Sequence, residues 1–90
     1  MKYRVFQSSR FRKSLKRMLA RGMDGAKLEA VVVKLANGEP LPLQNKDHAL
    51  SGNLSGLRDC HIENDWVLLY FYSTAGELVL TLTDTHADLF

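Results

Sequence analysis

The sequence predicts an α+β domain in which a helical hairpin packs on one side of a mainly antiparallel sheet, in the order βααβββ. The first half of the chain has one short alternating segment, followed by two stretches with the apolar spacing of amphipathic helices. The second half consists of apolar and aromatic segments separated by short polar turns, a pattern typical of antiparallel strands. Ninety residues provide for one hydrophobic core, so residues 1–90 are expected to form a single domain.

The N-terminal part predicts one strand and two helices. Residues 2–7 alternate between side-chain classes and predict the first strand. Ser8 and Ser9 offer a cap for a helix whose apolar positions follow at helical spacing: Phe11, Leu15, Met18 and Leu19. Gly22 suits the end of this helix, and Asp24 can cap a second helix with the apolar stripe Leu28, Val31, Val32 and Leu35. The short connection implies that the two helices are antiparallel.

The rest of the chain predicts a loop, three strands and a tail. Residues 39–55 hold both prolines and several polar residues, and we expect a loop there. The strands are predicted over residues 57–62, 66–72 and 78–83. Short turns join these strands, and residues 85–90 form a tail.

Positive charge is concentrated near the N-terminus. Residues 1–34 carry ten Lys or Arg against two acids, whereas residues 35–90 carry two against eight. A basic face of this density attracts a polyanion, for which RNA or DNA is the first candidate. The alternative is a solvated helix face without a partner.

The composition favours a cytoplasmic protein without membrane contact. No apolar run approaches the roughly 20 residues of a transmembrane helix, and the N-terminus lacks the apolar core of a signal peptide. Cys60 is the only cysteine, so no internal disulfide is possible and a reducing compartment is the simpler interpretation. It lies in a predicted strand, where we expect a buried thiol rather than a nucleophile.

Three histidines in the C-terminal half are the candidates for chemistry: His48, His61 and His86. The spacings of dedicated zinc sites, such as H-x-x-H, C-x-x-C or H-E-x-x-H, are absent, so neither a metal nor another cofactor is expected. Histidine has an ordinary pKa of about 6.5 and suits general acid–base work. RNA cleavage through the 2′-hydroxyl needs a base, an acid and a group that stabilises charge on the phosphate.

Three motifs resemble those of a known family. Residues 46–52 read K-D-H-x-L-x-G, residues 58–70 read R-D-x-H-x-x-x-D-W-x-L-x-Y, and residues 85–90 read T-H-x-x-L-F. In this order and near this spacing they resemble the YafQ-type toxins, which belong to the RelE/ParE superfamily of bacterial toxin–antitoxin systems. The resemblance covers the whole chain, including the basic helical hairpin.

The resemblance implies a RelE-like fold and a ribosome-dependent mRNA endonuclease that is held inactive by a cognate antitoxin, a small DNA-binding protein of the RelB/DinJ kind. In this family the active site includes the positions that match His48, His61, Asp65, Trp66, His86 and Phe90. His48 and His86 are then the candidates for proton transfer, with base and acid unassigned. His61 and Asp65 would orient groups or share that work. Trp66 and Phe90 would position bases or support the site.

The sequence departs from the family at Leu82, where many YafQ-like toxins have an arginine. Such an arginine would stabilise the scissile phosphate. Lys46, Arg58 or the basic first helix could supply the cation instead, and we count Lys46 and Arg58 as candidate substrate-binding residues. A structural salt bridge is at least as good an explanation of Arg58, because strand alternation places it opposite to His61.

Three functions remain open at this point. The first is the ribosome-dependent, metal-independent endoribonuclease. The second is a non-catalytic RNA- or ribosome-binding domain that has lost nuclease activity, for which Leu82 is the argument. The third is a gyrase-directed relative of the same superfamily, which the histidine set disfavours.

Overall fold

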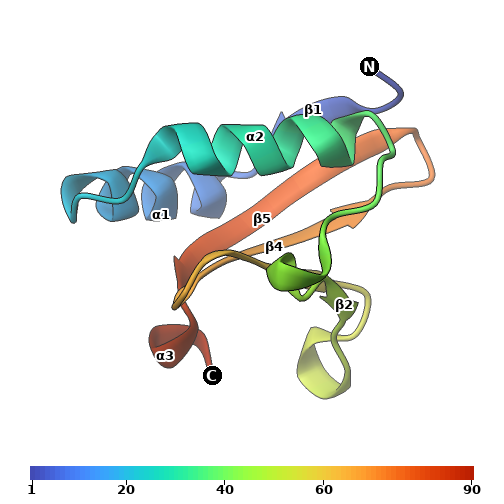
Figure 1. The fold of residues 1–90 in the computed structure, drawn as a ribbon. Coiled ribbons are helices and arrows are strands. Elements are labelled where there is room, and N and C mark those ends of the chain that lie inside the picture. Colours follow the sequence, from blue (N-terminus) through green and yellow to red (C-terminus); the bar gives the residue numbers. More distant parts are fainter.

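The computed structural model describes all 90 residues and has two helices on one face of a five-stranded sheet (Figure 1). The strands are β1 (Arg4–Gln7), β2 (His48–Ala49), β3 (Arg58–Glu63), β4 (Trp66–Tyr72) and β5 (Glu77–Thr85). The helices are α1 (Ser9–Ala20), α2 (Gly25–Ala36) and the short α3 (His86–Leu89), with 3₁₀ turns at Leu43–Asn45 and Gly52–Leu54. No helix has the length and apolar composition needed to cross a membrane.

The sheet has the strand order β1-β5-β4-β3-β2. Only β1 and β5 pair in parallel, and the other neighbours are antiparallel. The predicted helices on one side of a mainly antiparallel sheet are therefore confirmed. The order βααβββ is incomplete, because the predicted loop contains β2 and the predicted tail forms α3.

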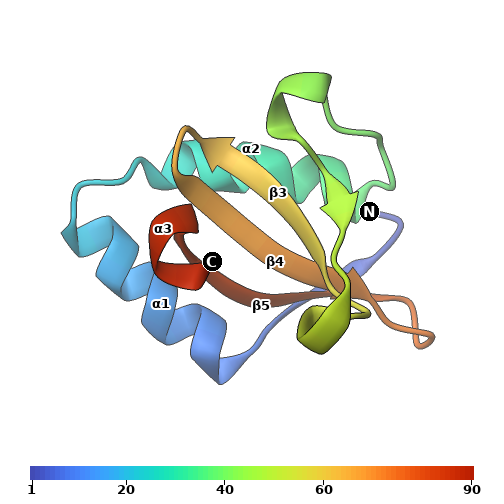
Figure 2. The ribbon, with the colours of Figure 1, turned by 90° about the horizontal axis from the view of Figure 1, so that it is seen from below.

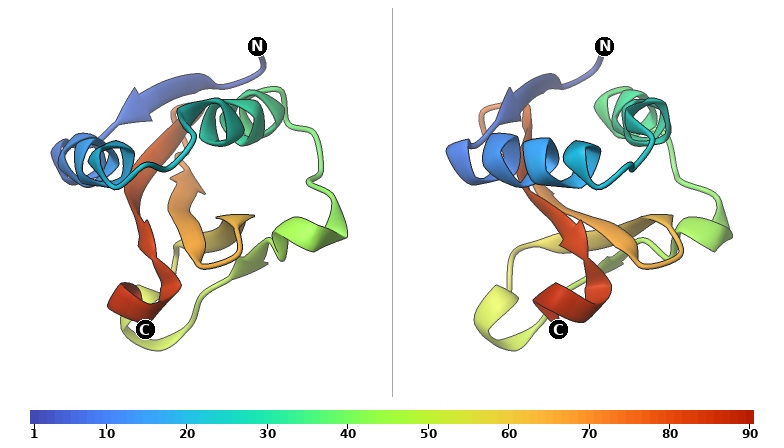
Figure 3. Two further views of the ribbon diagram at one scale, coloured as in Figure 1. Left: turned by 60° about the vertical axis from the view of Figure 1, so that its left-hand side comes forward. Right: turned by 90° about the vertical axis from the view of Figure 1, so that its left-hand side faces the viewer.

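The two long helices begin and end where the sequence predicts. The Ser8 side chain accepts a hydrogen bond from the Phe11 N–H, and the Asp24 side chain accepts one from the Ala26 N–H, each at 3.0 Å. Gly22 follows α1 with a φ of 92°, a conformation that glycine adopts without strain. Both helices lie on the same side of the sheet (Figure 3). They cross at an angle rather than run strictly antiparallel (Figure 2).

The hydrophobic core lies between these helices and the sheet. It includes the predicted helix residues Phe11, Met18, Leu28, Val31 and Leu35, together with Cys60 and Ile62 of β3. Leu19 is an exception, since 45% of it is exposed. Cys60 is fully buried, and burial raises the pKa of its thiol, so it is the inert core cysteine that the sequence predicts. The predicted N-terminal strand is confirmed as β1, but it lies at the sheet edge with all four residues exposed.

Strand register separates the two faces of the sheet. Because Cys60 and Ile62 face the helices, their neighbours Asp59 and His61 point to the opposite face. Asp59 lies in one cross-strand row with His48, Leu69 and Leu82, and His61 lies in the next row with Val67 and Asp84. We call this side the open face because α1 and α2 pack on the other one, although Asp59, Val67 and Leu69 on it are buried. It carries two of the three histidines.

A buried polar network ties α1 to β5. The Ser14 hydroxyl donates to the Phe11 carbonyl and accepts from the Thr83 N–H, at 3.0 and 3.1 Å. The Thr83 hydroxyl accepts from the Trp66 indole N–H and donates to the Val67 carbonyl, both at 2.8 Å. The polar groups of these buried side chains all have hydrogen-bond partners. The network therefore fixes the position of α1 relative to β5.

Thr83→Val tests this network. Valine keeps the shape of threonine but leaves the buried indole N–H of Trp66 without an acceptor. We expect the free energy of unfolding, measured by urea denaturation, to fall by about 1–3 kcal/mol. Thr81→Val is the matched control on the same strand, because the Thr81 hydroxyl is buried without a hydrogen-bond partner and its loss should cost little. Equal losses in the two variants would contradict the role of the network.

Candidate active site

The fold brings the three histidines together around one carboxylate. The rings of His61 and His86 have their centres 5.6 Å apart, and His48 Nε2 lies 3.8 Å from Asp59 Oδ2. Potential ligand atoms of Asp59, His61 and His86 all lie within 4.8 Å of one another. In Figure 2, the view from below, β2, β3 and α3 border the same open side of the molecule. This cluster is the candidate active site.

His48 is placed by β2 and by a backbone carbonyl. β2 pairs with β3 so that His48 stands opposite Asp59. The His48 Nδ1 atom lies 2.6 Å from the Lys46 carbonyl, which can only accept, so Nδ1 carries a hydrogen. In the neutral ring the free lone pair is then on Nε2, the atom that faces Asp59. This tautomer suits a group that takes up a proton.

Asp47 anchors the segment that leads into β2. Its carboxylate accepts hydrogen bonds from the Tyr70 hydroxyl at 2.6 Å and from Arg58 Nε at 3.3 Å. Burial raises the pKa of the Tyr70 hydroxyl, which keeps it a donor at neutral pH. Arg58 lies on the same side of β3 as Cys60, which is opposite to the side of His61. The structure therefore does not bring Arg58 to the histidines, and shows it in the salt bridge that the sequence left open.

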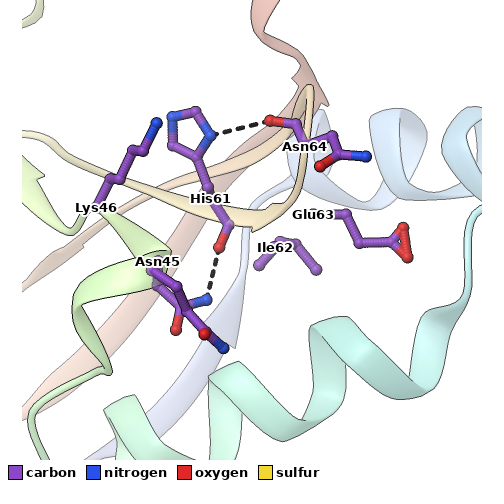
Figure 4. Close-up of a pocket in the computed structure, with 7 residues that line it drawn as sticks. Asn45, Lys46, His61, Ile62, Glu63 and Asn64 are labelled. Atoms are coloured by element: carbon purple, nitrogen blue, oxygen red, sulfur yellow. Dashed lines mark hydrogen bonds between the residues drawn. The ribbon is translucent and has the colours of Figure 1, made fainter.

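His61 occupies β3 beside the turn into β4. Its Nδ1 lies 3.1 Å from the Asn64 carbonyl, so the neutral ring again has its lone pair on Nε2. Its own carbonyl accepts from the Asn45 side chain at 2.7 Å (Figure 4). A polar notch of about 330 Å³ lies next to the ring, and Lys46 stands at its edge. Lys46 has a φ of 48°, and it is the only non-glycine residue with a positive φ. Such conformations gather at functional sites.

His86 is held in place by Asp65. The Asp65 backbone carbonyl accepts from the His86 N–H, and its carboxylate accepts from the Ala87 N–H at 3.2 Å. The Thr85 hydroxyl caps the same turn by accepting from the Asp88 N–H at 3.1 Å. The His86 ring lies against Phe90, with centres 4.8 Å apart. Asp65 thus orients the histidine that the tail contributes.

Asp59 is the functional candidate that sequence reasoning missed. Only 1% of it is exposed, and neither carboxylate oxygen has a hydrogen-bond partner. Burial raises the pKa of Asp59, and charge on the three histidines opposes that shift. The sequence offers one signal for Asp59, which is a charged residue next to Cys60 in a predicted strand. Its place in a row with His48 becomes evident only once β2 is paired.

Trp66 and Phe90 differ in access to the surface. Trp66 is 1% exposed and donates to Thr83 on the helix face, so it cannot stack on a base, and only its supporting role remains. Phe90 is 51% exposed beside His86 and can stack on a base. Leu82 is partly exposed on the open face, two strands from Asp59.

The histidines of the cluster have ring nitrogens that can take part in proton transfer. His48 and His61 have Nε2 atoms that can accept protons, and His86 has no hydrogen bond that fixes its ring. Asp59, His61 and His86 could also hold a transition metal, since imidazole and carboxylate are suitable ligands.

Residues 3–90 match the family described as bacterial toxin of type II toxin–antitoxin system, YafQ. The mRNA interferase toxin YafQ of Escherichia coli K12 is 40% identical over 84 residues, which is 92% of this chain and 90% of that protein. A copper-bound mutant toxin from Helicobacter pylori has a TM-score of 0.92 at 34% identity, over 98% of this chain and 99% of that one. A chain of the E. coli DinJ–YafQ complex has a TM-score of 0.87 at 37% identity, over 98% of each chain. These matches confirm the resemblance to the YafQ-type toxins, and the chain belongs to the YafQ family of type II toxin–antitoxin toxins.

Proposed function

We propose that this protein is an mRNA interferase that cuts mRNA on the ribosome by histidine acid–base chemistry and so stops translation. The cluster of three histidines around Asp59 carries the proposal. The E. coli relative is named an mRNA interferase toxin, and its 40% identity over most of the chain supports the same activity here. Action on translating mRNA places the protein in the cytoplasm.

His48 and His86 move the protons. One removes the proton of the 2′-hydroxyl, and the other protonates the departing 5′-oxygen. The fixed tautomer of His48 favours it as the base, since its Nε2 lone pair is available. His86 is exposed and free of ring hydrogen bonds, so it can approach a leaving group. His61, whose ring is fixed by the Asn64 carbonyl, orients the neighbouring imidazole or the phosphate.

The two acids have separate tasks. Asp65 positions His86 through the backbone of α3. Asp59 lies beneath the histidines and, when ionised, stabilises the positive charge that an imidazole acquires when it takes up a proton. Among the basic candidates, Lys46 is exposed at the edge of the notch beside His61 and can contact the scissile phosphate. Phe90 stacks on a base.

The shape of this site supports dependence on the ribosome. The histidines lie on an open face, with His48 and His86 exposed, and no deep pocket encloses them. In-line attack by the 2′-oxygen requires a fixed RNA backbone. The ribosome supplies that alignment, while the basic α1 provides attraction to RNA phosphates.

A cognate antitoxin restrains the free toxin. One structural relative is a chain of the DinJ–YafQ complex, which supports a partner of that kind for this protein. The surplus of positive charge in residues 1–34 favours an acidic partner segment.

A second candidate is a ribosome-binding domain without nuclease activity, which Leu82 favours because it places no cation on β5. Primer extension on mRNA separates the two functions. A translation mixture with the purified protein should show cuts in phase with codons, and naked mRNA should remain intact. Co-sedimentation with ribosomes without any cut would establish the second candidate instead.

Glutamine substitutions test the division of labour. Glutamine keeps hydrogen bonding but does not titrate near neutral pH, so His48→Gln and His86→Gln should each lower the cleavage rate by about 10² to 10⁴. His61→Gln should cost less. Primer extension in the translation mixture gives the rates, while circular dichroism and ribosome co-sedimentation show that the fold and binding persist. Undiminished cutting by both variants would reject the histidine mechanism.

Asp59→Asn should make the chain more stable but less active. Because the pKa of Asp59 is raised in the folded state, the wild-type protein loses stability as the pH rises from about 4 through that raised value. Asparagine does not ionise, so the stability of the variant relative to wild type should increase over this window. Urea denaturation at several pH values measures the difference. A pH-independent difference for Asp59→Asn would contradict the assignment.

The proposed reaction needs no metal, and a metal in the cluster should inhibit it. A chelator selective for transition metals, which leaves ribosomal Mg²⁺ in place, should not change the cleavage rate. Added Cu²⁺ should bind through Asp59, His61 and His86 and block proton transfer. The structural relative from H. pylori is a copper-bound toxin, which supports this choice of ion. Calorimetry should show weaker Cu²⁺ binding in His61→Gln. Activity that the chelator removes and a metal restores would overturn metal independence.

A further inference from the structure

A basic groove lies between α1 and the C-terminal part of β5, outside the histidine cluster. It encloses about 300 Å³ and is lined by Arg10, Lys13, Ser14, Arg17, Leu82, Asp84 and Leu89. In Figure 1, the C-terminal end of β5 has α1 above it and α3 below it. β1 ends at Gln7 and pairs with β5 only up to Leu80, so this part of β5 has α1 as its neighbour.

The charges in this groove are not balanced. Asp84 is its only acid, and Arg17 binds that carboxylate at 2.8 Å. Arg10 and Lys13 form none of the five ion pairs in the structure and are exposed. Two cations are therefore free to bind an anion, while the Arg17–Asp84 pair fixes one wall of the groove.

The groove is in register with the active site. Leu82, on its floor, lies in the row of Asp59 and His48, and Asp84 lies in the row of His61. In both rows β4 lies between the groove residue on β5 and the active-site residue on β3. Two strand spacings place the groove roughly 10 Å from Asp59 and His61. Val67 and Leu69 of the intervening strand are buried, so an RNA strand that runs from the histidines to the groove passes over the side chains that cover them. The span is a short stretch of RNA backbone.

We propose that this groove binds the mRNA phosphate that flanks the scissile bond, with Arg10 and Lys13 as its ligands. The inference rests on the proposed function, because it extends the RNA path away from the histidines. The apolar Leu82 leaves the groove open to the phosphate and places no competing charge on its floor. The contact aligns the 2′-oxygen for attack and does not itself transfer a proton.

A matched pair of double variants tests the position of the charge. Arg10→Gln with Lys13→Gln empties the groove of its free cations, and Arg17 is kept because it holds Asp84. Arg12→Gln with Lys16→Gln removes the same charge from positions on α1 that do not line the groove. General attraction to RNA falls equally in both. We expect the groove variant to cut ribosome-bound mRNA about tenfold more slowly than the control, and Leu82→Arg to restore part of the loss.

RNA binding tests the groove without any cleavage. A trinucleotide with a 2′-deoxy sugar at the cut position cannot react, and a dinucleotide spans only the scissile phosphate. In NMR titrations the trinucleotide should shift the signals of Arg10 and Lys13 together with those of His61, and the dinucleotide should shift only His61. Extension on the 5′ or the 3′ side shows which flank enters the groove.

The outcomes separate this inference from the proposed function. Equal losses in the two double variants, or no loss in either while wild type cuts, would overturn the groove as a phosphate site. Absence of cutting by wild type would overturn the proposed function, and the titrations would still decide on the groove. Shifts of Arg10 and Lys13 that are the same with both oligonucleotides would reject a flanking phosphate.

Discussion

The burial of Cys60 and Ile62 beneath the helices organises both faces of the sheet. Because side chains alternate along a strand, these two residues force Asp59 and His61 onto the open face. Pairing of β2 with β3 then sets His48 opposite Asp59, and the turn into β4 sets Asp65 against α3. A slip of one residue in β3 would exchange the two faces, placing carboxylate and imidazole in the core and cysteine on the side of the histidines. Apolar packing on one side therefore determines the polar arrangement on the other.

Asp59 is retained at a cost to the fold. A buried carboxylate without a hydrogen-bond donor is unfavourable, and the neighbouring histidines offset this only when they are charged. Thr83, equally buried, has every hydrogen bond satisfied. Thr83 therefore stabilises the fold, whereas Asp59 destabilises it and has its role in the proposed reaction.

The parts of the structure that were predictable from sequence are those with local signals. Both long helices have caps, a stripe of apolar residues and a glycine or asparagine at the end, all within one segment. β2 and α3 have two and four residues, too few for any periodicity, and they depend on pairing with β3 and on Asp65. The three histidines could be named from residue type and motif, whereas Asp59 and Asp47 needed the register of β2. By residue type alone Trp66 favours a stacking role at the surface, because the sequence does not show that its side chain is buried.

α3 also gives the site a dependence on local unfolding. A single helical turn has no stability of its own, and this one is held by Asp65, Thr85 and the packing of Phe90 on His86. When the turn opens, His86 leaves the other histidines while the core under α1 and α2 stays intact. In the proposed mechanism, the fraction of molecules able to react then equals the fraction in which these last residues are docked. A contact that favours docking would raise the apparent activity, and one that competes for Phe90 would lower it, with no change in any intrinsic rate constant.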